Sequence, residues 1–403
     1  MNLEAAVITA VCTNKDIGSV LTENADDLFT SHRDVWEGVK SYYMKYKAVP
    51  DVEVIVDKFP DFEPVSGNGQ SAYYVDKLRN EYIGNRLREI ILQGGTSLKT
   101  NSSLRVLQQL QADTAALSKF TNIVKDLDLM DVENAETHYL ATKARSDVMG
   151  GSPGIATGIK AIDTAYSTGM APGHLIYIIG WPSRGKSWLT TLLAVNAWKQ
   201  GFRPMIVSLE MSPEVVRDRV YTVMGEGAFS NTRLTRGDIN IDDFRSKTKR
   251  MFADRNSFIV VSSEGVNDVT PNVVQGKIDQ HKPDIVFLDY HQLFTDNRKS
   301  TSPVERNMNI SREFKLLAIN NNIPVVDITA ATSNDVSDRN DPPMLAQVAW
   351  SKSLEYDADM AMAAHKEGDI IEVVSRKNRY GPEFGLFMNW DVDSGVIRES
   401  FDR

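Results

Sequence analysis

Residues 180–187 constrain the fold more than any other stretch of the chain. They read Gly-Trp-Pro-Ser-Arg-Gly-Lys-Ser and fit the phosphate-binding loop pattern G-x-x-x-x-G-K-[ST]. A short apolar run at 174–179 precedes the loop and predicts a buried parallel strand, and residues 188–199 predict a helix. A glycine turn before a helical lysine also fits the pattern alone, but the flanking strand and helix favour a nucleotide-binding loop.

The loop predicts a nucleotide site that uses Mg²⁺. Its backbone N–H groups and the positive end of the following helix would face the phosphates. Lys186 would reach the β- and γ-phosphates, and the Ser187 hydroxyl would hold the metal ion. The predicted nucleotide-binding residues of the loop are Gly180, Trp181, Pro182, Ser183, Arg184, Gly185, Lys186 and Ser187.

Two carboxylates follow predicted strands and are candidates for the chemistry of this site. Asp289 ends the hydrophobic stretch 284–289, and we expect it to bind the Mg²⁺ of the nucleotide rather than to cap a strand. Glu210 follows the strand predicted at 205–209. It either accepts a proton from the water that attacks the γ-phosphate or serves as an N-terminal acid of the next helix, and the spacing does not decide between the two.

Two cations, Lys377 and Arg379, follow the strand predicted at 370–375, where Gly381 and Pro382 predict a hairpin turn. Residues at this spacing on a strand point to the same side, so both side chains could contact phosphate oxygens. An inserted arginine contributes about 10³–10⁵ in rate to phosphoryl transfer. Spacing alone favours an ordinary basic surface hairpin.

The apolar pattern divides the 403 residues into three parts. Residues 1–121 show helical spacing and predict an all-α domain. Residues 122–153 carry an acidic stretch and a glycine-rich break, and predict a linker with a short helix at 138–148. Residues 154–403 alternate strands with helices and predict an α/β domain with a mainly parallel sheet covered on both faces. The expected strands are 175–179, 205–209, 258–262, 285–288, 324–328, 359–363 and 370–375.

Composition argues against several classes of protein. Cys12 is the single cysteine, so neither an internal disulfide nor a zinc cluster is expected. No apolar run reaches the ~18 residues of a membrane span, and the N-terminus lacks the basic region of a signal peptide, so a cytoplasmic protein is expected. The net charge of -9 argues against a generally basic surface for nucleic acid, but not against a local basic channel.

These motifs, in this order, resemble the DnaB family of replicative helicases. The resemblance rests on 154–163, Gly173-His-Leu, Ser208-Leu-Glu-Met-Ser212, Arg233-Leu-Thr-Arg-Gly237 and Asp289-Tyr-His-Gln-Leu293. It continues through 311–318, 323–326, 355–359 and 377–382, and in outline through the N-terminal part. The fold implied is a RecA-like P-loop ATPase domain preceded by a helical collar domain. The length and the departures described below look more like a phage-encoded member than a bacterial one.

The resemblance implies an ATP hydrolase that forms a homo-hexameric ring, moves 5′ to 3′ along single-stranded DNA and unwinds duplex DNA at a fork. It implies ATP, or another nucleoside triphosphate, and Mg²⁺ as cofactors, and a primase and a helicase loader as partners. It implies that Glu210 is the general base, that Arg219 lies near the nucleotide, and that Lys377 and Arg379 reach into a neighbouring subunit's site. The helix at 138–148 would pack on the adjacent subunit.

The chain departs from the family at the end of the strand predicted at 324–328. The family places a glutamine there that senses the γ-phosphate, whereas this chain has Ala330. Alanine has no side-chain hydrogen-bonding group, so Thr329 or Thr332 is a candidate substitute.

A second departure concerns the loop that meets DNA. The family carries Arg-Glu-Ser-Gly there, whereas residues 349–352 read Ala-Trp-Ser-Lys. Lys352 is a candidate phosphate contact, and Trp350 either stacks on a base or is packed in the fold. Arg298, Lys299 and Arg306 either line the DNA channel or belong to a solvated basic loop.

Two other functions fit the same motifs. A RecA- or RadA-like recombinase shares the segment 377–381, but the helical N-terminal part and Ser208-Leu-Glu-Met211 argue against it. A DnaB-like scaffold that recruits a primase or loader and unwinds poorly is suggested by the missing glutamine.

Overall fold

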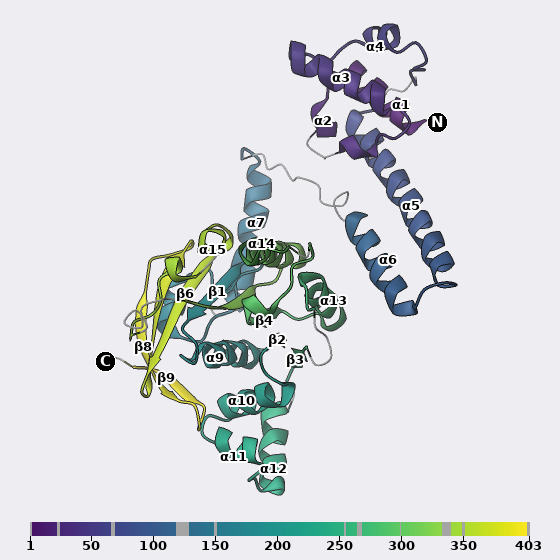
Figure 1. Cartoon of the computed structure of the whole chain (residues 1–403). Coiled ribbons are helices and arrows are strands. Elements are labelled where there is room, and N and C mark those ends of the chain that lie inside the picture. Colours follow the sequence, from purple (N-terminus) through teal and green to yellow (C-terminus); the bar gives the residue numbers. More distant parts are fainter. Residues whose placement is uncertain are drawn as a thin grey trace. The chain divides into compact units, whose positions relative to one another are not determined.

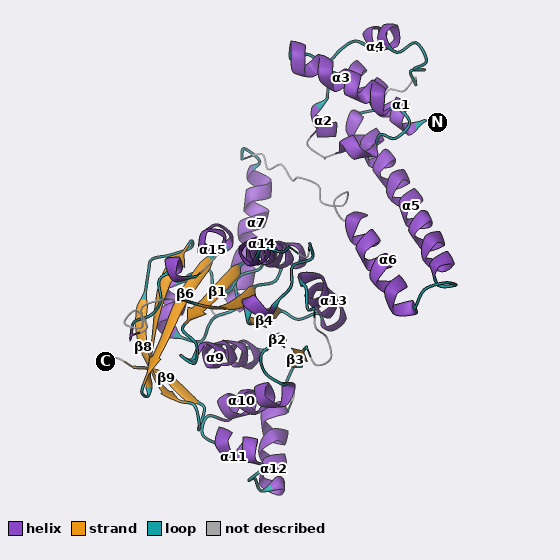
Figure 2. Cartoon of the chain, in the orientation of Figure 1, coloured by secondary structure: helices purple, strands orange, loops and turns teal. Residues whose placement is uncertain are grey.

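The chain forms two compact units, Met1–Asp131 and Val132–Arg403, in the computed structural model, and each is described by itself (Figure 1). The first unit is built of helices, and the second combines helices with a sheet (Figure 2). The structure describes residues 2–21, 25–65, 69–117, 129–148, 151–253, 255–263, 268–298, 300–332, 340–348 and 351–400.

The first unit is all helical in its described part, as the apolar pattern predicts. Its elements are α1 (Leu3–Asn14), α2 (Gly18–Leu21), η1 (Ala25–Leu28), α3 (Arg33–Tyr46), α4 (Val52–Lys58), α5 (Ser71–Ser97) and α6 (Ser103–Leu117). The helices enclose one apolar core, in which Trp36 stacks on Phe29 with 4.8 Å between ring centroids. The carboxylate of Glu4 on α1 accepts hydrogen bonds from the N–H groups of the turn before α3.

The second unit alternates helices with strands. Its described helices are α7 (Val132–Val148), α8 (Lys160–Ala165), α9 (Lys186–Lys199), α10 (Pro213–Gly225), α11 (Asn231–Arg236), α12 (Ile241–Phe252), α13 (Pro271–His281), η3 (His291–Leu293), α14 (Pro303–Asn321), η5 (Leu345–Gln347) and α15 (Ser351–Asp357). Its strands are β1 (Leu175–Gly180), β2 (Pro204–Ser208), β3 (Ile259–Ser262), β4 (Ile285–Asp289), β5 (Val325–Ala330), β6 (Met360–Glu367), β7 (Ile370–Asn378), β8 (Gly385–Asp391) and β9 (Val396–Ser400).

All of these strands belong to one sheet, in the order β3-β2-β4-β5-β1-β6-β7-β8-β9. The strands from β3 to β6 in this order pair in parallel. From β6 to β9 the pairing is antiparallel. The carboxyl ends of the parallel strands therefore meet at one edge, where ligands of such sheets bind.

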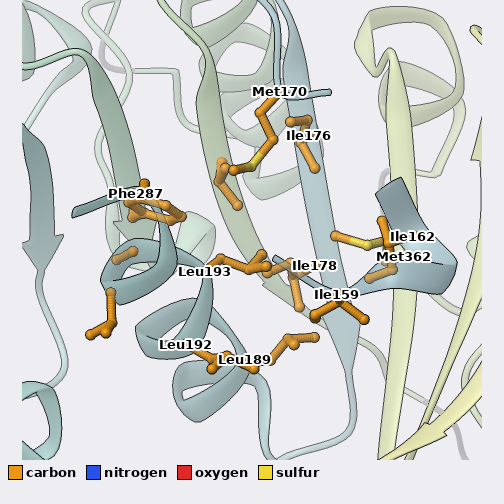
Figure 3. Packing of buried hydrophobic residues seen from close by; sticks show 14 of the residues in the cluster. Ile159, Ile162, Met170, Ile176, Ile178, Leu189, Leu192, Leu193, Phe287 and Met362 are labelled. Atoms are coloured by element: carbon orange, nitrogen blue, oxygen red, sulfur yellow. The ribbon is translucent and has the colours of Figure 1, made fainter. Parts of the chain in front are cut away.

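Successive side chains of β1 point to opposite faces of the sheet, because side chains alternate along a strand. Ile176 and Ile178 pack with Leu189 and Leu193 of α9 in one core (Figure 3). Leu175, Tyr177 and Ile179 belong to the core of the other face, which includes residues of α13 and α14. Every residue of β1 is buried, which explains why its sequence is a continuous apolar run.

The structure extends the sequence prediction at three places. Strands β8 and β9 were not predicted, although Leu386, Met388 and Trp390 alternate with more exposed residues in β8. Strand β7 continues through Asn378, so Lys377 lies within the strand. Helix α7 begins at Val132 rather than at residue 138. Part of the acidic stretch thus forms its first turns, where negative charge favours a helix.

Within the described ranges, no helix is both long enough and apolar enough to cross a membrane.

The start of β1 is held by a cluster of polar groups around the buried Asp359. One carboxylate oxygen of Asp359 accepts the N–H of Leu175 at 2.8 Å and the ammonium of Lys315 at 2.6 Å. The other accepts a guanidinium N–H of Arg379 at 3.0 Å. Beside this cluster, the hydroxyl of Tyr166 lies 2.6 Å from Nδ1 of His174. The His174 ring also stacks on Tyr380.

Burial lowers the pKa of His174 to about 4; the cations Lys315 and Arg379 act in the same direction, and Asp359 acts against them. The folded chain therefore holds this imidazole neutral while the unfolded chain protonates it near pH 6.5. Its contribution to stability is full above pH 6.5 and declines as the pH falls toward 4.

We predict that His174→Gln flattens this dependence. The free energy of unfolding of the wild type should lose about 2–3 kcal/mol more than that of the variant between pH 7 and pH 4. Urea unfolding of both proteins across this range measures the difference. Parallel stability curves for the two proteins would show that His174 does not titrate on unfolding.

Candidate active site

The phosphate-loop residues turn from β1 into α9 at the carboxyl edge of the sheet. Gly185 precedes α9 with φ of 91°, a conformation that favours glycine. A Cβ on Gly180 would lie 2.9 Å from the carbonyl oxygen of Ala364 on β6. Both glycines of the motif are therefore required by the backbone path, and the start of α9 faces a cleft.

The cleft has a volume of about 430 Å³. It is lined by Pro182, Ser183, Arg184, Gly185, Lys186, Ser187, Trp188, Glu210, Met211, Arg219, Tyr290 and Ala330. These residues come from β1–α9, from the ends of β2, β4 and β5, and from α10. The structure thus brings together most of the residues predicted to bind nucleotide, together with Glu210.

Lys186 is a largely buried cation in this cleft. Its ammonium donates a hydrogen bond to the carbonyl of Trp181 at 2.8 Å. Burial lowers the pKa of Lys186, and the carboxylates of Asp289 and Glu210 act in the opposite direction. The two carboxylates are therefore close enough to Lys186 to favour its charged form.

Asp289, the last residue of β4, is only 3% exposed. Burial raises its pKa to about 6; the neighbouring Glu210 acts in the same direction, whereas a hydrogen bond from Ser187 and the cations Arg219 and Lys186 act against it. Its Oδ1 is buried and has no hydrogen-bond partner within the described part of the chain. A carboxylate oxygen of this kind, next to a serine hydroxyl, fits a hard cation.

Mg²⁺ would be held by Asp289 and Ser187 together with the phosphates of the nucleotide. Among the described residues, no group of three or more His, Cys, Asp or Glu side chains could hold a metal by itself. Mg²⁺ in nucleotide sites uses one or two protein carboxylates together with phosphate and water ligands.

Glu210 and Arg219 complete the cleft from the side of β2 and α10. Ser208 pairs with Asp289 across β2 and β4, and Leu209 N–H donates to the carbonyl of Asp289. Glu210, the next residue, is exposed in the cleft. The guanidinium of Arg219 lies 5.2 Å from the ring centroid of Trp188. Burial lowers the pKa of Arg219, whereas Asp289 and Glu210 raise it.

Lys377 and Arg379 lie outside this cleft, at the opposite edge of the sheet. Asn378 pairs with Met360, the first residue of β6, which in turn pairs with Ile176 near the start of β1. The phosphate loop begins where β1 ends, and a strand of six residues spans about 20 Å. Lys377 donates to the carbonyl of Glu355, and Arg379 is bound by Asp359. Neither cation can serve the cleft of its own chain.

The side chain of Trp181 also lies outside the lining of the cleft. Its indole is buried and donates to the carbonyl of Asp341 at 2.8 Å. Arg184 lines the cleft and donates to the carbonyl of Lys366.

The side-chain amide of Gln292, which the sequence analysis did not single out, lies at the end of β5. Ala330 lines the cleft. The side-chain amide of Gln292 donates to the Thr329 hydroxyl at 3.2 Å and to the Ala330 carbonyl at 3.1 Å. The sequence signal was the segment 289–293, in which Gln292 follows Asp289 by three residues. Thr332 is exposed, and its N–H donates to the carbonyl of Gln347.

The residues predicted to meet DNA are only partly described. Arg298 and Lys352 are exposed. Arg306 on α14 is half-buried, and among the described residues its buried Nε has no hydrogen-bond partner. Lys299 and Trp350 lie outside the described residues.

Known proteins are similar to this chain in sequence and in fold. The probable plasmid replicative DNA helicase of Chlamydia psittaci is 27% identical over 255 residues, which cover 60% of this chain and 55% of that protein. The replicative DNA helicase DnaC of Bacillus subtilis is 28% identical over 312 residues, which cover 69% of this chain and 65% of that protein. The matched part therefore spans between half and two thirds of the length of these relatives.

Two solved structures have the same fold. A DnaB-like replicative helicase, studied with its interactions with primase, aligns over 98% of both chains with a TM-score of 0.69 and 19% identity. A second solved structure, of an ATPase domain, aligns over 68% of this chain and 100% of that chain, with a TM-score of 0.58 and 22% identity. The family model for the DnaB-like helicase C-terminal domain matches residues 154–392. Since this match covers more than half of the sequence, the chain belongs to the DnaB-like helicase family.

Proposed function

We propose that the chain is an ATP-dependent replicative DNA helicase that works as a homo-hexameric ring. It moves 5′ to 3′ along single-stranded DNA and unwinds duplex DNA at a fork. The observation that carries the proposal is the split site: the cleft collects Lys186, Ser187 and Glu210 beside the buried Asp289, whereas the cationic pair starting at Lys377 lies at the opposite edge of the sheet. Such a site needs a second copy of the chain.

The polar residues of the split site have distinct roles in ATP hydrolysis. Lys186 and the N–H groups at the start of α9 bind the phosphates. Asp289 and the Ser187 hydroxyl would hold Mg²⁺, which would supply positive charge beside the phosphates. Glu210 accepts a proton from the attacking water, since it is an exposed carboxylate beside the metal-binding Asp289. Arg219 stabilises phosphate charge from the α10 side, and Arg379 does so from the neighbouring subunit.

Exposed apolar side chains support assembly. Helices α5 and α6 expose Ile91, Leu92, Leu104 and Leu107. On α7, Tyr139 and Leu140 are exposed by 70% and 61%. Exposed apolar patches mark interaction surfaces. We therefore propose that residues 1–121 form a collar, that 122–153 link it to the ATPase domain at 154–403, and that α7 packs on the adjacent subunit.

Single-stranded DNA, a primase and a helicase loader are the proposed partners. Exposed cations at Arg298 and Lys352 are suited to DNA phosphates. The primase is proposed because a structural relative was studied with its interactions with primase. A ring that recruits these partners but unwinds poorly is the second candidate function. It is favoured by Ala330, which offers the cleft no amide of its own.

Unwinding of forked DNA tests the proposal. We expect the wild type with ATP and Mg²⁺ to unwind a fork that carries a free 5′ tail and to leave a fork with only a 3′ tail intact. Glu210→Gln should lower DNA-stimulated ATP hydrolysis by about 10²–10⁴-fold, because it removes the base, and should abolish unwinding. ATP hydrolysis without unwinding of either fork would favour the scaffold, and an unchanged rate in Glu210→Gln would contradict the role of this residue.

Mixed assemblies test whether Arg379 acts on a neighbouring site. Arg379→Ala and Lys186→Ala should each be inactive alone. In an equimolar random mixture, about one quarter of the interfaces join an intact cleft to an intact arginine. We expect ATPase activity to return to that extent.

The control for this mixture combines Lys186→Ala with Glu210→Gln. Both substitutions damage the same cleft, so no interface in the mixture is intact and no activity should return. Equal activity in the two mixtures would contradict the assignment of Arg379 to the neighbouring site.

A further inference from the structure

Trp181 connects the phosphate loop to the segment that follows β5. Its indole is 1% exposed, and its Nε1–H donates to the carbonyl of Asp341 at 2.8 Å. The ring belongs to the buried apolar cluster that also includes Ala331, Val348 and Leu354. The side chain of this loop residue is therefore directed at residues 340–348 rather than at the nucleotide.

Arg376 holds the same segment from β7. Ala361 pairs with Lys377 and Met362 with Ser375, which leaves Arg376 as the extra residue of a β-bulge. Bulges redirect side chains. The guanidinium of Arg376 donates from Nε to the carbonyl of Pro343 at 2.9 Å and from Nη2 to that of Pro342 at 2.7 Å.

Trp181 and Arg376, from different parts of the ATPase fold, thus bind three consecutive carbonyls. These are the carbonyls of Asp341, Pro342 and Pro343. Both prolines are buried, and each fixes its own φ and lacks an N–H. The backbone freedom of the stretch is therefore reduced, and its carbonyls are tied to both side chains. It continues through η5 toward α15, on which Lys352 is exposed.

Lys186 links this arrangement to the nucleotide. Its ammonium donates to the main-chain carbonyl of Trp181 at 2.8 Å. In the proposed function the same ammonium binds the β- and γ-phosphates, which draw it away from that carbonyl. Bound nucleotide would therefore compete with the Trp181 carbonyl for this ammonium.

We propose that Trp181 and Arg376 are positioning residues that clamp residues 341–343 and make the placement of segment 340–348 and α15 depend on the nucleotide. The clamp thereby couples ATP hydrolysis to single-stranded DNA. This inference rests on the proposed function, since it assigns α15 to the DNA side. Because coupling is reciprocal, the clamp also makes DNA affinity depend on the nucleotide.

The test compares four variants with the wild type. Trp181→Phe removes the indole N–H and keeps an aromatic ring, and Arg376→Gln removes both guanidinium contacts. Arg376→Lys keeps a charged donor. Trp198→Phe is the matched control, because its indole is 4% exposed and donates to the carbonyl of Asn256 at 2.7 Å, away from the cleft.

Two ratios are measured for each protein with an oligo-dT strand. The first is the ATPase kcat with the strand divided by kcat without it. The second is the strand's Kd without nucleotide divided by its Kd with a non-hydrolysable ATP analogue. We expect both ratios to fall about fivefold or more in Trp181→Phe and Arg376→Gln, and Arg376→Lys to recover part of the loss. Trp198→Phe should lower thermal stability and leave both ratios at the wild-type value.

The outcomes separate the clamp from the proposed function. Wild-type ratios in Trp181→Phe and Arg376→Gln, with a wild type that responds to DNA, would overturn the clamp alone. Equal losses in Trp198→Phe would overturn it as well, because they would reflect general destabilisation. A wild type whose ATP hydrolysis ignores DNA would overturn the clamp and the proposed function together.

Discussion

The buried carboxylate of Asp359 fixes the geometry on which the ATPase unit depends. It joins the first residue of β1 to Lys315 of α14 and to Arg379 beyond β7. A fully buried carboxylate is tolerated when cations and N–H groups satisfy it, and loss of one partner leaves a costly unpaired charge. The same group therefore sets where β1 begins and where the arginine is held.

Because the strands pair in parallel, fixing the start of β1 also fixes the position of its carboxyl end at the other edge of the sheet. Because β1 lies between β5 and β6 in this parallel sheet, its carboxyl end lies at the same edge of the sheet as the carboxyl ends of β2, β4 and β5. Asp289 and Glu210 are brought together because Ser208 and Asp289 are paired residues of β2 and β4. The burial that stabilises this edge also raises the pKa of Asp289. Strand order thus determines where the cleft forms, and burial at this edge raises the pKa of its carboxylate Asp289.

Local sequence patterns predicted the parts of the site that local structure determines. The phosphate loop, Asp289 and the strand before Glu210 each lie within one strand–turn unit, so a short motif identifies them. The orientation of Trp181 depends instead on Asp341, which is 160 residues away in the sequence. Arg376 depends on a bulge, and Gln292 on the pairing of two strand ends. The contacts of Trp181 and Arg376 have no local pattern, which is why Trp181 was expected among the nucleotide-binding residues and Arg376 was given no role. Gln292 has a local signal in its position after Asp289, but the strand end that it contacts cannot be identified from that segment alone.

The separation of Arg379 from its own cleft has a consequence for how activity depends on concentration. If Arg379 acts on a neighbouring site, as proposed, a site is complete only where two chains meet. A lone chain then has none, and an open row of chains has one fewer than its members. Closing the row into a ring adds the last site without adding a chain. Dilution would therefore lower the turnover per chain before it unfolds any chain, and the number of working sites would report whether the assembly is closed.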